Sequence, residues 1–334
     1  MFGKPYRFED FGRLFLQRLV RHAGGRLEER PRRVIVGRPV EYAGARPDPA
    51  LARCRYDLML REFGAELHCV YEPLGTAYSY AARLTEPATV LVADFGGGTT
   101  DFPIVRVAEP GVARRCTPLA SSGVGIAGDR FDRRIVERLV LPMLGKGGRY
   151  RSMGKLLDIP GGWFAEFVDW SRLALMRNRR TLDGLRRLQR DALAPEPIGR
   201  MIALIEHEQG FPLYDAVGRL KRALSAETRA EFRFEGGGVE IAAEVDRCDF
   251  EAWIAPDLLA IKAALDDALT RAGLEPGAID RVFLTGGSLL IPAIRAIFDR
   301  RFGKEKIATG GELTSIAHGL ALIGEEADVA AWAA

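Results

Sequence analysis

The chain has 334 residues, of which 47% are hydrophobic and 28% charged, a composition typical of a folded protein with two or three domains. A formal net charge of +3 gives no reason to expect nucleic acid or an anionic membrane as a partner. Four scattered cysteines and four scattered histidines disfavour a zinc site and a disulfide framework, so a reducing cytoplasm is expected. No apolar run approaches the roughly 18 residues of a membrane span, and the start of the chain lacks a signal-peptide pattern.

The first 90 residues alternate helix and strand patterns. Phe11, Phe15 and Leu19 share one helical face, and the strand-like run RVIVGRPV follows. After a second helix, the short strand ELHCVY ends at Glu72 and Pro73, and proline suits the first turn of a helix. That helix, LGTAYSYAARL, has small residues on one side. The alternation is typical of an α/β fold.

The next stretch, LVADFGGGTTDFPIV at residues 91–105, indicates two strands joined by a glycine turn. Glycines adopt backbone angles closed to other residues, so their amides can converge on an anion such as phosphate. Thr99 and Thr100 add hydroxyls, while Asp94 and Asp101 supply carboxylates suited to Mg²⁺, directly or through water. We interpret the turn as a phosphate and magnesium site, and its glycines are Gly96, Gly97 and Gly98.

Other interpretations of glycine-rich stretches are weaker. The hairpin could be a plain tight turn that two acids cap. It is not a Walker A loop, which needs a following helix and a Lys-Ser/Thr pair, and GGRYRSMGKL near Gly154 fails on spacing. A dinucleotide fingerprint is disfavoured because a strand rather than a helix follows the glycines.

The middle of the chain, residues 141–239, has a different character. Glycine-rich breaks lead into arginine-rich helices, and the segment 172–190 predicts an amphipathic helix with a solvated basic face, with anion binding as the alternative. AEFRFEGGGVEIAAEV predicts a hairpin. The last hundred residues return to α/β, with a long helix, the strand RVFLT, a GGS turn, a helix opened by Pro292 and the small-residue helix ELTSIAHGLALIG.

The glycine hairpin resembles the second phosphate motif of the DnaK-type, seventy-kilodalton heat-shock chaperones of the actin-like ATPase superfamily. Five more stretches resemble motifs of that family in the same order: EPLGTAYSYA a hinge helix, GIAGDRFDRRIVERLV a helix start, GRLKRALS the helix over adenine, LTGGSLLIPAIRAIF the adenosine motif and TSIAHGLAL the second connecting helix. Six ordered matches are far more specific than one. The resemblance is nearest the short YegD-type branch.

The resemblance implies ATP or ADP with Mg²⁺ as cofactors, and a role for each matching residue. Asp94 and Asp101 would organise magnesium and its waters, Thr99 would touch the terminal phosphate, and Glu72 would hold a metal-bound or attacking water. The other implied nucleotide contacts are the phosphate cradle of Gly96, Gly97, Gly98 and Thr100, the nucleoside wall of Gly286, Gly287 and Ser288, and the base-side residues Lys221, Arg222 and Ser225. A plain solvated helix face is the alternative for the last three.

The fold that the resemblance implies is an α/β, two-lobed, ribonuclease H-like one. Residues 1–88 and 313–334 would form the remainder of the first lobe with the hinge helices, 89–130 and 254–312 the α/β core of the second lobe, and 131–253 a mostly helical insertion with a short hairpin. Small residues would let the two hinge helices approach closely and pivot, namely Gly75, Ala77, Ala317 and Gly319.

Several positions depart from the family pattern. Leu290 stands where an arginine stacks on adenine, and Gly218 replaces an acid, which puts adenine affinity in question. The first phosphate hairpin of the family, an Asp-x-Gly-Thr-Thr stretch, and its catalytic lysine are not found in these 334 residues. We therefore expect an N-terminally truncated first lobe, impaired ATP hydrolysis, and self-association through an exposed first-lobe edge.

The sequence thus predicts a cytoplasmic, ATP-binding, chaperone-like protein whose family activity is ATP hydrolysis and whose client and co-chaperone are unidentified. Two alternatives stay open. One is a non-hydrolysing nucleotide-binding or scaffold protein of the same fold. The other is an actin-fold sugar kinase or polyphosphatase, which the Lys-Arg-x-Leu-Ser pattern of the helix GRLKRALS disfavours.

Overall fold

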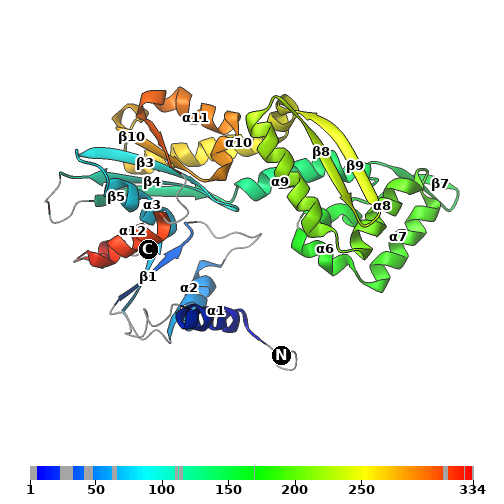
Figure 1. Cartoon of the computed structure of the whole chain (residues 1–334), viewed down its shortest axis with the longest axis horizontal. Coiled ribbons are helices and arrows are strands. Elements are labelled where there is room, and N and C mark those ends of the chain that lie inside the picture. Colours follow the sequence, from blue (N-terminus) through cyan, green and yellow to red (C-terminus); the bar gives the residue numbers. More distant parts are fainter. Residues whose placement is uncertain are drawn as a thin grey trace. The chain divides into compact units, whose positions relative to one another are not determined.

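The computed structural model describes residues 6–22, 33–40, 48–61, 66–109, 112, 116–168, 170–310, 315–326 and 328–332. The chain forms two compact units (Figure 1): unit 1 is Met1–Gly125, Ile261–Gly287 and Phe298–Ala334, and unit 2 is Ile126–Ala260 and Ser288–Ile297. Unit 2 contains the expected insertion, residues 131–253, together with residues that were expected in the second-lobe core. The expected division between two lobes stays a prediction. The start of the expected last helix, residues 312–314, lies outside the described residues.

Unit 1 is built on a five-stranded mixed sheet in the order β11-β10-β3-β4-β5. β10 is parallel to β3 and β11, while β3, β4 and β5 form an antiparallel meander. Residues 90–93 of β3 and 282–284 of β10 are all apolar because both faces of these strands are buried. The bounds are β3 Ala88–Phe95, β4 Thr100–Val107, β5 Cys116–Val124, β10 Arg281–Thr285 and β11 Ile307–Thr309.

Helices cover both faces of this sheet (Figure 1). On one face, α3 (Glu72–Ala81) and α12 (Ser315–Glu325) pack over a cluster that includes Val90, Val92 and Val105. On the other face, Phe298 of α11 (Pro292–Phe302) packs edge-on against Phe95 of β3, with ring centroids 6.1 Å apart. The alternation of side chains along β3 therefore places Asp94 on the same face as Val92, toward α3.

The N-terminal part of unit 1 is a small α/β layer. β1 (Arg33–Arg38) and β2 (Glu66–Tyr71) form a parallel two-stranded sheet, accompanied by α1 (Phe8–His22) and α2 (Pro49–Leu60). α1 has no buried residue, and its Phe8, Phe11 and Phe15 are each at least 60% exposed. No described helix has the length and apolar character needed to cross a membrane.

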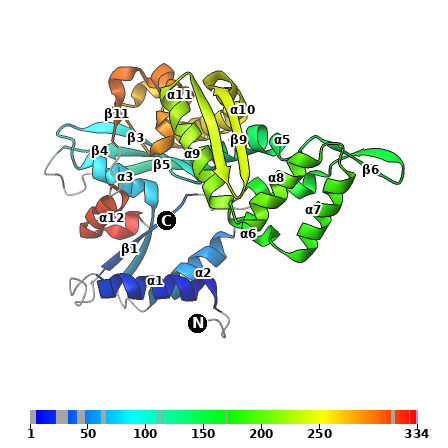
Figure 2. The ribbon, with the colours of Figure 1, turned by 45° about the vertical axis from the view of Figure 1, so that its right-hand side comes forward.

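Unit 2 is mainly helical with two hairpins (Figure 2). The boundary between the units falls within α10 and within α11. In the two units together, short 3-10 turns occupy Gly161–Val168, Pro276–Ala278, Gly287–Leu290, Lys304–Lys306 and Val329–Trp332. The remaining elements are α4 Gly128–Ile135, a π turn Val136–Val140, α5 Leu141–Met143, β6 Arg149–Ser152, β7 Lys155–Asp158, α6 Trp170–Met176, α7 Arg179–Asp191, α8 Pro195–Glu206, α9 Gly210–Ala226, β8 Arg229–Gly236, β9 Val239–Asp246 and α10 Arg247–Ala272.

The structure confirms one hairpin of unit 2 and adds another. β8 and β9 pair as predicted, around Gly237 and Gly238 with φ of 60° and 77°, the conformation that a two-residue turn requires. β6 and β7 form an unpredicted hairpin, whose turn holds Met153 and Gly154 at positive φ. GGRYRSMGKL is therefore a hairpin, consistent with its exclusion as a phosphate loop.

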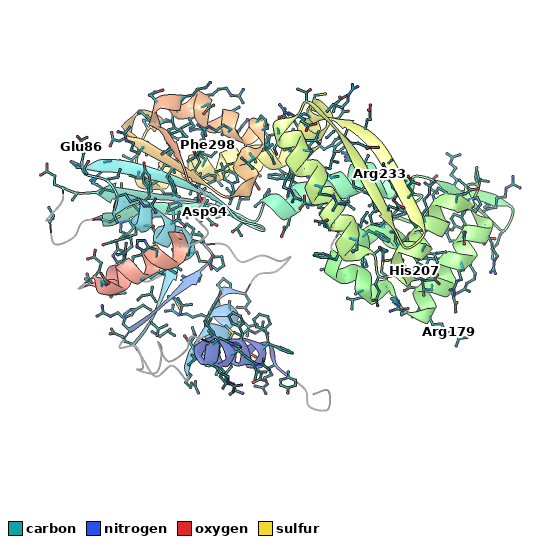
Figure 3. The ribbon with its side chains drawn as sticks, in the orientation of Figure 1. Glu86, Asp94, Arg179, His207, Arg233 and Phe298 are labelled. Carbon is teal, nitrogen blue, oxygen red and sulfur yellow. The ribbon has the colours of Figure 1, made fainter. Side chains whose placement is uncertain are left out.

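The arginine-rich segment 172–190 forms two helices instead of one, because Asn178 caps α7 by accepting a hydrogen bond from the Thr181 amide at 2.9 Å. Leu185 and Leu188 of α7 are buried while the arginines face solvent, and Arg179 is the extended basic side chain labelled in Figure 3. The predicted amphipathic helix with a solvated basic face is thus confirmed in α7.

Candidate functional site

The glycine turn between β3 and β4 is closed by a hydrogen bond from the Gly96 amide to the Thr99 carbonyl, 3.0 Å long. Its three glycines are exposed, whereas Thr100 is buried. The expectation that these glycines use unusual backbone angles is wrong, since none of the three has a positive φ. A Cβ atom built on Gly98 would meet no atom within 4 Å. Neither a positive φ nor internal crowding therefore requires glycine at position 98.

The two carboxylates of the hairpin face the same side. Asp94 and Asp101 are directly opposite partners on antiparallel β3 and β4, and side chains of such pairs begin about 4.5–5.5 Å apart. Asp94 is partly buried near the carboxyl end of β3, as Figure 3 shows, and accepts a hydrogen bond from the Thr76 hydroxyl at 3.2 Å. Asp101 is 5% exposed and lies against Gly123 of β5, where any Cβ would come within 2.4 Å of its Oδ1.

Glu72 brings a third carboxylate toward this end of the sheet. It is the first residue of α3, and its Cγ lies where a side chain on Gly37 of β1 would begin, so glycine is needed there. Burial raises the pKa of Glu72, and the nearby Asp94 charge raises it further. Burial also raises the pKa of Asp94, against the lowering effect of the Thr76 hydrogen bond. The Asp94 charge thus acts on Glu72, and the roles that the resemblance implies for the two carboxylates stay a prediction.

A second glycine turn lies beside the hairpin. β10 is parallel to β3 with Thr285 opposite Asp94, so the two strands end at the same sheet edge. Gly286 has a φ of 100°, and a Cβ there would lie 2.0 Å from the Phe95 carbonyl oxygen, so only glycine permits this approach. Gly287 has open space around it. Ligands of open α/β sheets bind at such carboxyl ends, and this edge is the candidate site of unit 1.

The residues expected on the base side belong to unit 2. Lys221 of α9 makes an ion pair with Asp132 of α4 at 2.8 Å and also donates to the Gly128 carbonyl at 3.1 Å. Ser225 donates to the Lys221 carbonyl of its own helix at 3.0 Å. Arg222 is exposed. Two of the three expected base contacts thus serve the packing of unit 2, and their role toward a nucleoside stays a prediction.

The wall expected from the adenosine motif continues past Gly287 into unit 2. Ser288 is buried, with 6% of its surface exposed. Leu290, which stands in the place of the family's arginine, is 67% exposed. An exposed leucine offers apolar surface and no hydrogen bond donor.

The two hinge helices approach as closely as their small residues predict. A Cβ on Gly319 of α12 would lie 1.7 Å from the Gly75 carbonyl oxygen of α3, and one on Gly75 would lie 2.8 Å from the Ile316 carbonyl oxygen. Ala77 is also buried, but Ala317 is exposed and lies outside the contact. The close approach is confirmed, and pivoting stays a prediction.

Asp94 and Asp101 supply carboxylate oxygens of the kind that Mg²⁺ binds. Among the described residues, no group of three or more His, Cys, Asp or Glu side chains is arranged to hold a metal ion. Mg²⁺ commonly keeps several waters and uses one or two carboxylates together with phosphate oxygens, and Asp94 with Asp101 fits that pattern. The metal, when bound, would neutralise phosphate charge beside the exposed glycines.

Three residues of this edge were missed by the sequence reasoning: Gly37, Thr76 and Gly123. Gly37 and Gly123 make room for carboxylates that come from distant segments, so only the pairing of strands reveals them. Thr76 did carry a signal, because a threonine within a helix of small residues is an unusual place for a hydroxyl.

Comparison with known proteins finds similarity to heat-shock chaperones. The model of the family described as "Hsp70 protein" matches residues 208–327. The "Chaperone protein DnaK" of Thermus thermophilus is 25% identical over 334 residues, covering 98% of this chain and 46% of that protein. The "Chaperone protein dnaK" of Emiliania huxleyi is 26% identical over 242 residues, 72% of this chain and 30% of the relative. A heat shock protein homolog of the yeast Lachancea kluyveri is 32% identical over 110 residues, 32% of this chain and 16% of the relative.

The chain is matched nearly end to end, yet it spans about half the length of the first of these relatives. The family model covers α9, the hairpin β8–β9, the adenosine-motif turn and α12, and the Thermus match extends over the glycine hairpin as well.

Proposed function

The chain belongs to the Hsp70 family, and from this premise we propose that it is a chaperone-like protein that binds Mg²⁺-ATP or Mg²⁺-ADP through its nucleotide-binding domain. The observation that carries the proposal is the pair of glycine turns at one sheet edge of unit 1, with Asp94, Asp101 and Glu72 beside them. Phosphates would meet the Gly96–Gly98 turn and Thr99. The nucleoside contacts expected of Lys221, Arg222, Ser225 and Ser288 remain predictions from the resemblance.

ATP hydrolysis is the activity that the family resemblance implies, and we propose that it is weak in these 334 residues. The supporting observation is that these 334 residues contain one glycine hairpin of this kind, whereas the family pattern uses two for electrostatic stabilisation. Removing a single preorganised donor of this kind typically costs about 10²–10³ in rate. A nucleotide-binding protein that does not hydrolyse ATP is therefore the second candidate.

Isothermal titration separates these outcomes. ADP should bind in the presence of Mg²⁺ and bind more weakly in EDTA, and phosphate release from ATP should stay at the background rate. Absence of ADP binding with Mg²⁺ would overturn the nucleotide function. Phosphate release above background that disappears in Asp94→Asn would overturn the impaired hydrolysis and leave nucleotide binding standing.

The proposal extends to partners and location. Client proteins are the expected macromolecular partners, and the cytoplasm is the expected compartment, which four cysteines in the free state favour. We further propose self-association through unit 1. β1 and β2 each have one edge that no described strand pairs with, and α1 exposes Phe8, Phe11 and Phe15 nearby in sequence.

A further inference from the structure

We propose that Thr76 is a positioning residue for Asp94: its hydroxyl fixes Oδ2 of the carboxylate and leaves Oδ1 for the waters of a bound magnesium ion. The inference rests on the nucleotide function proposed above and adds to that site a residue which does not itself touch the ligand. The juxtaposition that supports it is the 3.2 Å hydrogen bond from the Thr76 hydroxyl in α3 to Asp94 at the end of β3.

Burying the hydroxyl of Thr76 is unfavourable unless the hydroxyl forms a hydrogen bond. Its side chain has no exposed surface, and its neighbours in the helix, Gly75 and Ala77, are small and buried. A threonine inside a helix ordinarily bonds a carbonyl of its own preceding turn. Here the hydrogen bond that the structure shows crosses to another element. A buried hydroxyl of this kind is explained by the carboxylate it holds.

The charges around Asp94 show why a donor is needed on this side. Glu72 precedes Thr76 by four residues, so both lie on the same face of α3, and the Asp94 charge raises the pKa of Glu72. Asp101 is the direct strand partner of Asp94. Asp94 therefore has acidic neighbours on two elements, and the Thr76 hydroxyl is the side-chain donor that the structure shows on its carboxylate. The Thr76 hydroxyl defines one orientation in the absence of metal.

Helix α3 also supplies a matched control. Ser79 is as deeply buried as Thr76, with 2% of its surface exposed, and its hydroxyl lies 3.2 Å from Nδ1 of His318 in α12. Removing the Ser79 hydroxyl thus costs α3 a buried hydrogen bond without touching Asp94. Comparing the two positions separates a local effect on the carboxylate from a general loosening of the helix.

The test is titration calorimetry of ADP at a series of Mg²⁺ concentrations and in EDTA, on the full chain and on Thr76→Val, Thr76→Ser and Ser79→Ala. We expect Thr76→Val to raise the Mg²⁺ concentration needed for half-maximal enhancement of ADP binding about tenfold, the usual cost of losing a partner of a metal-binding side chain. ADP affinity in EDTA should be unchanged. Thr76→Ser should restore the wild-type Mg²⁺ dependence, and Ser79→Ala should retain it.

Two results would overturn the positioning role. One is a Thr76→Val protein with the Mg²⁺ dependence of the wild type. The other is an equal loss of ADP affinity with Mg²⁺ and in EDTA, which would show a structural role only. If Thr76→Val does not fold, Thr76→Ala takes its place with the same expectations. Failure of the nucleotide function is distinguishable, since the wild-type chain itself would then bind no ADP.

Discussion

At the scale of single residues, the candidate site concentrates negative charge in a partly buried place. Glu72 and Asp94 both have pKa values raised by burial, and the charge of Asp94 adds to the effect on Glu72. Asp101 is almost fully buried on the neighbouring strand. Such an arrangement is unfavourable for an empty protein, and it is typical of a site that a cation completes.

The substitution Asp94→Asn tests the free-energy cost of holding the Asp94 charge in this partly buried place. Asparagine keeps an acceptor for the Thr76 hydroxyl and removes the charge, so we expect it to stabilise the metal-free chain by roughly 0.5–2 kcal/mol at neutral pH. Because the folded-state pKa of Asp94 is raised, the wild type binds a proton more readily when folded, and its stability falls as pH rises from the ordinary aspartate range through that raised value.

The advantage of Asp94→Asn should therefore be largest at neutral pH and shrink as the pH is lowered toward that of an ordinary carboxylic acid. Urea unfolding at several pH values measures it. An Asp94→Asn protein less stable than the wild type at neutral pH would contradict the account of a charge held at a cost.

At the scale of elements, the site is the shared carboxyl end of β3 and β10. The sequence identifies both turns, because glycine runs after apolar strands are visible without a structure. The two turns are neighbours because β3 pairs in parallel with β10. In the sequence these strands are separated by the whole first segment of unit 2, residues 126–260. The supporting contacts of Gly37, Thr76 and Gly123 depend on tertiary packing as well, which is why composition and spacing do not predict them.

Substitution by alanine should have different effects on stability at the two glycines of the β10 turn. Gly286→Ala places a Cβ 2.0 Å from the Phe95 carbonyl oxygen at a φ of 100°, and should destabilise the chain by about 1–3 kcal/mol or more. Gly287→Ala meets open space and should leave stability nearly unchanged. Thermal or urea unfolding of both variants measures the difference, and equal stability would contradict the close approach of this turn to β3.

At the scale of the whole molecule, the order of motifs predicts the family and the α/β class, while the boundaries come from packing. Unit 2 consists of residues 126–260 and 288–297, so the first half of α11 belongs to it and the second half to unit 1. No pattern in the sequence indicates that the helix opened by Pro292 is divided in this way. The hairpin β6–β7 was missed because its strands are four residues each and its turn needs a positive φ at Met153. Short strands carry too few alternations to be recognised.

Self-association is also a property of the whole chain. Sedimentation velocity should show oligomers for the wild type and a shift toward monomer for Phe11→Glu combined with Phe15→Glu, because the charges prevent burial of these two exposed rings of α1. Leu259→Glu, at an equally exposed position of α10, is the control and should behave like the wild type. A monodisperse wild-type monomer would contradict the proposal.

We propose that the β3–β4 turn is open because phosphate approaches it. A Cβ on Gly98 or on Gly277 meets nothing within 4 Å, so valine at either place should be tolerated by the fold. Titration of Mg²⁺-ADP should then show a tenfold or greater loss for Gly98→Val, about 1.4 kcal/mol, and unchanged affinity for Gly277→Val. Equal affinity of both variants and the wild type would contradict the account.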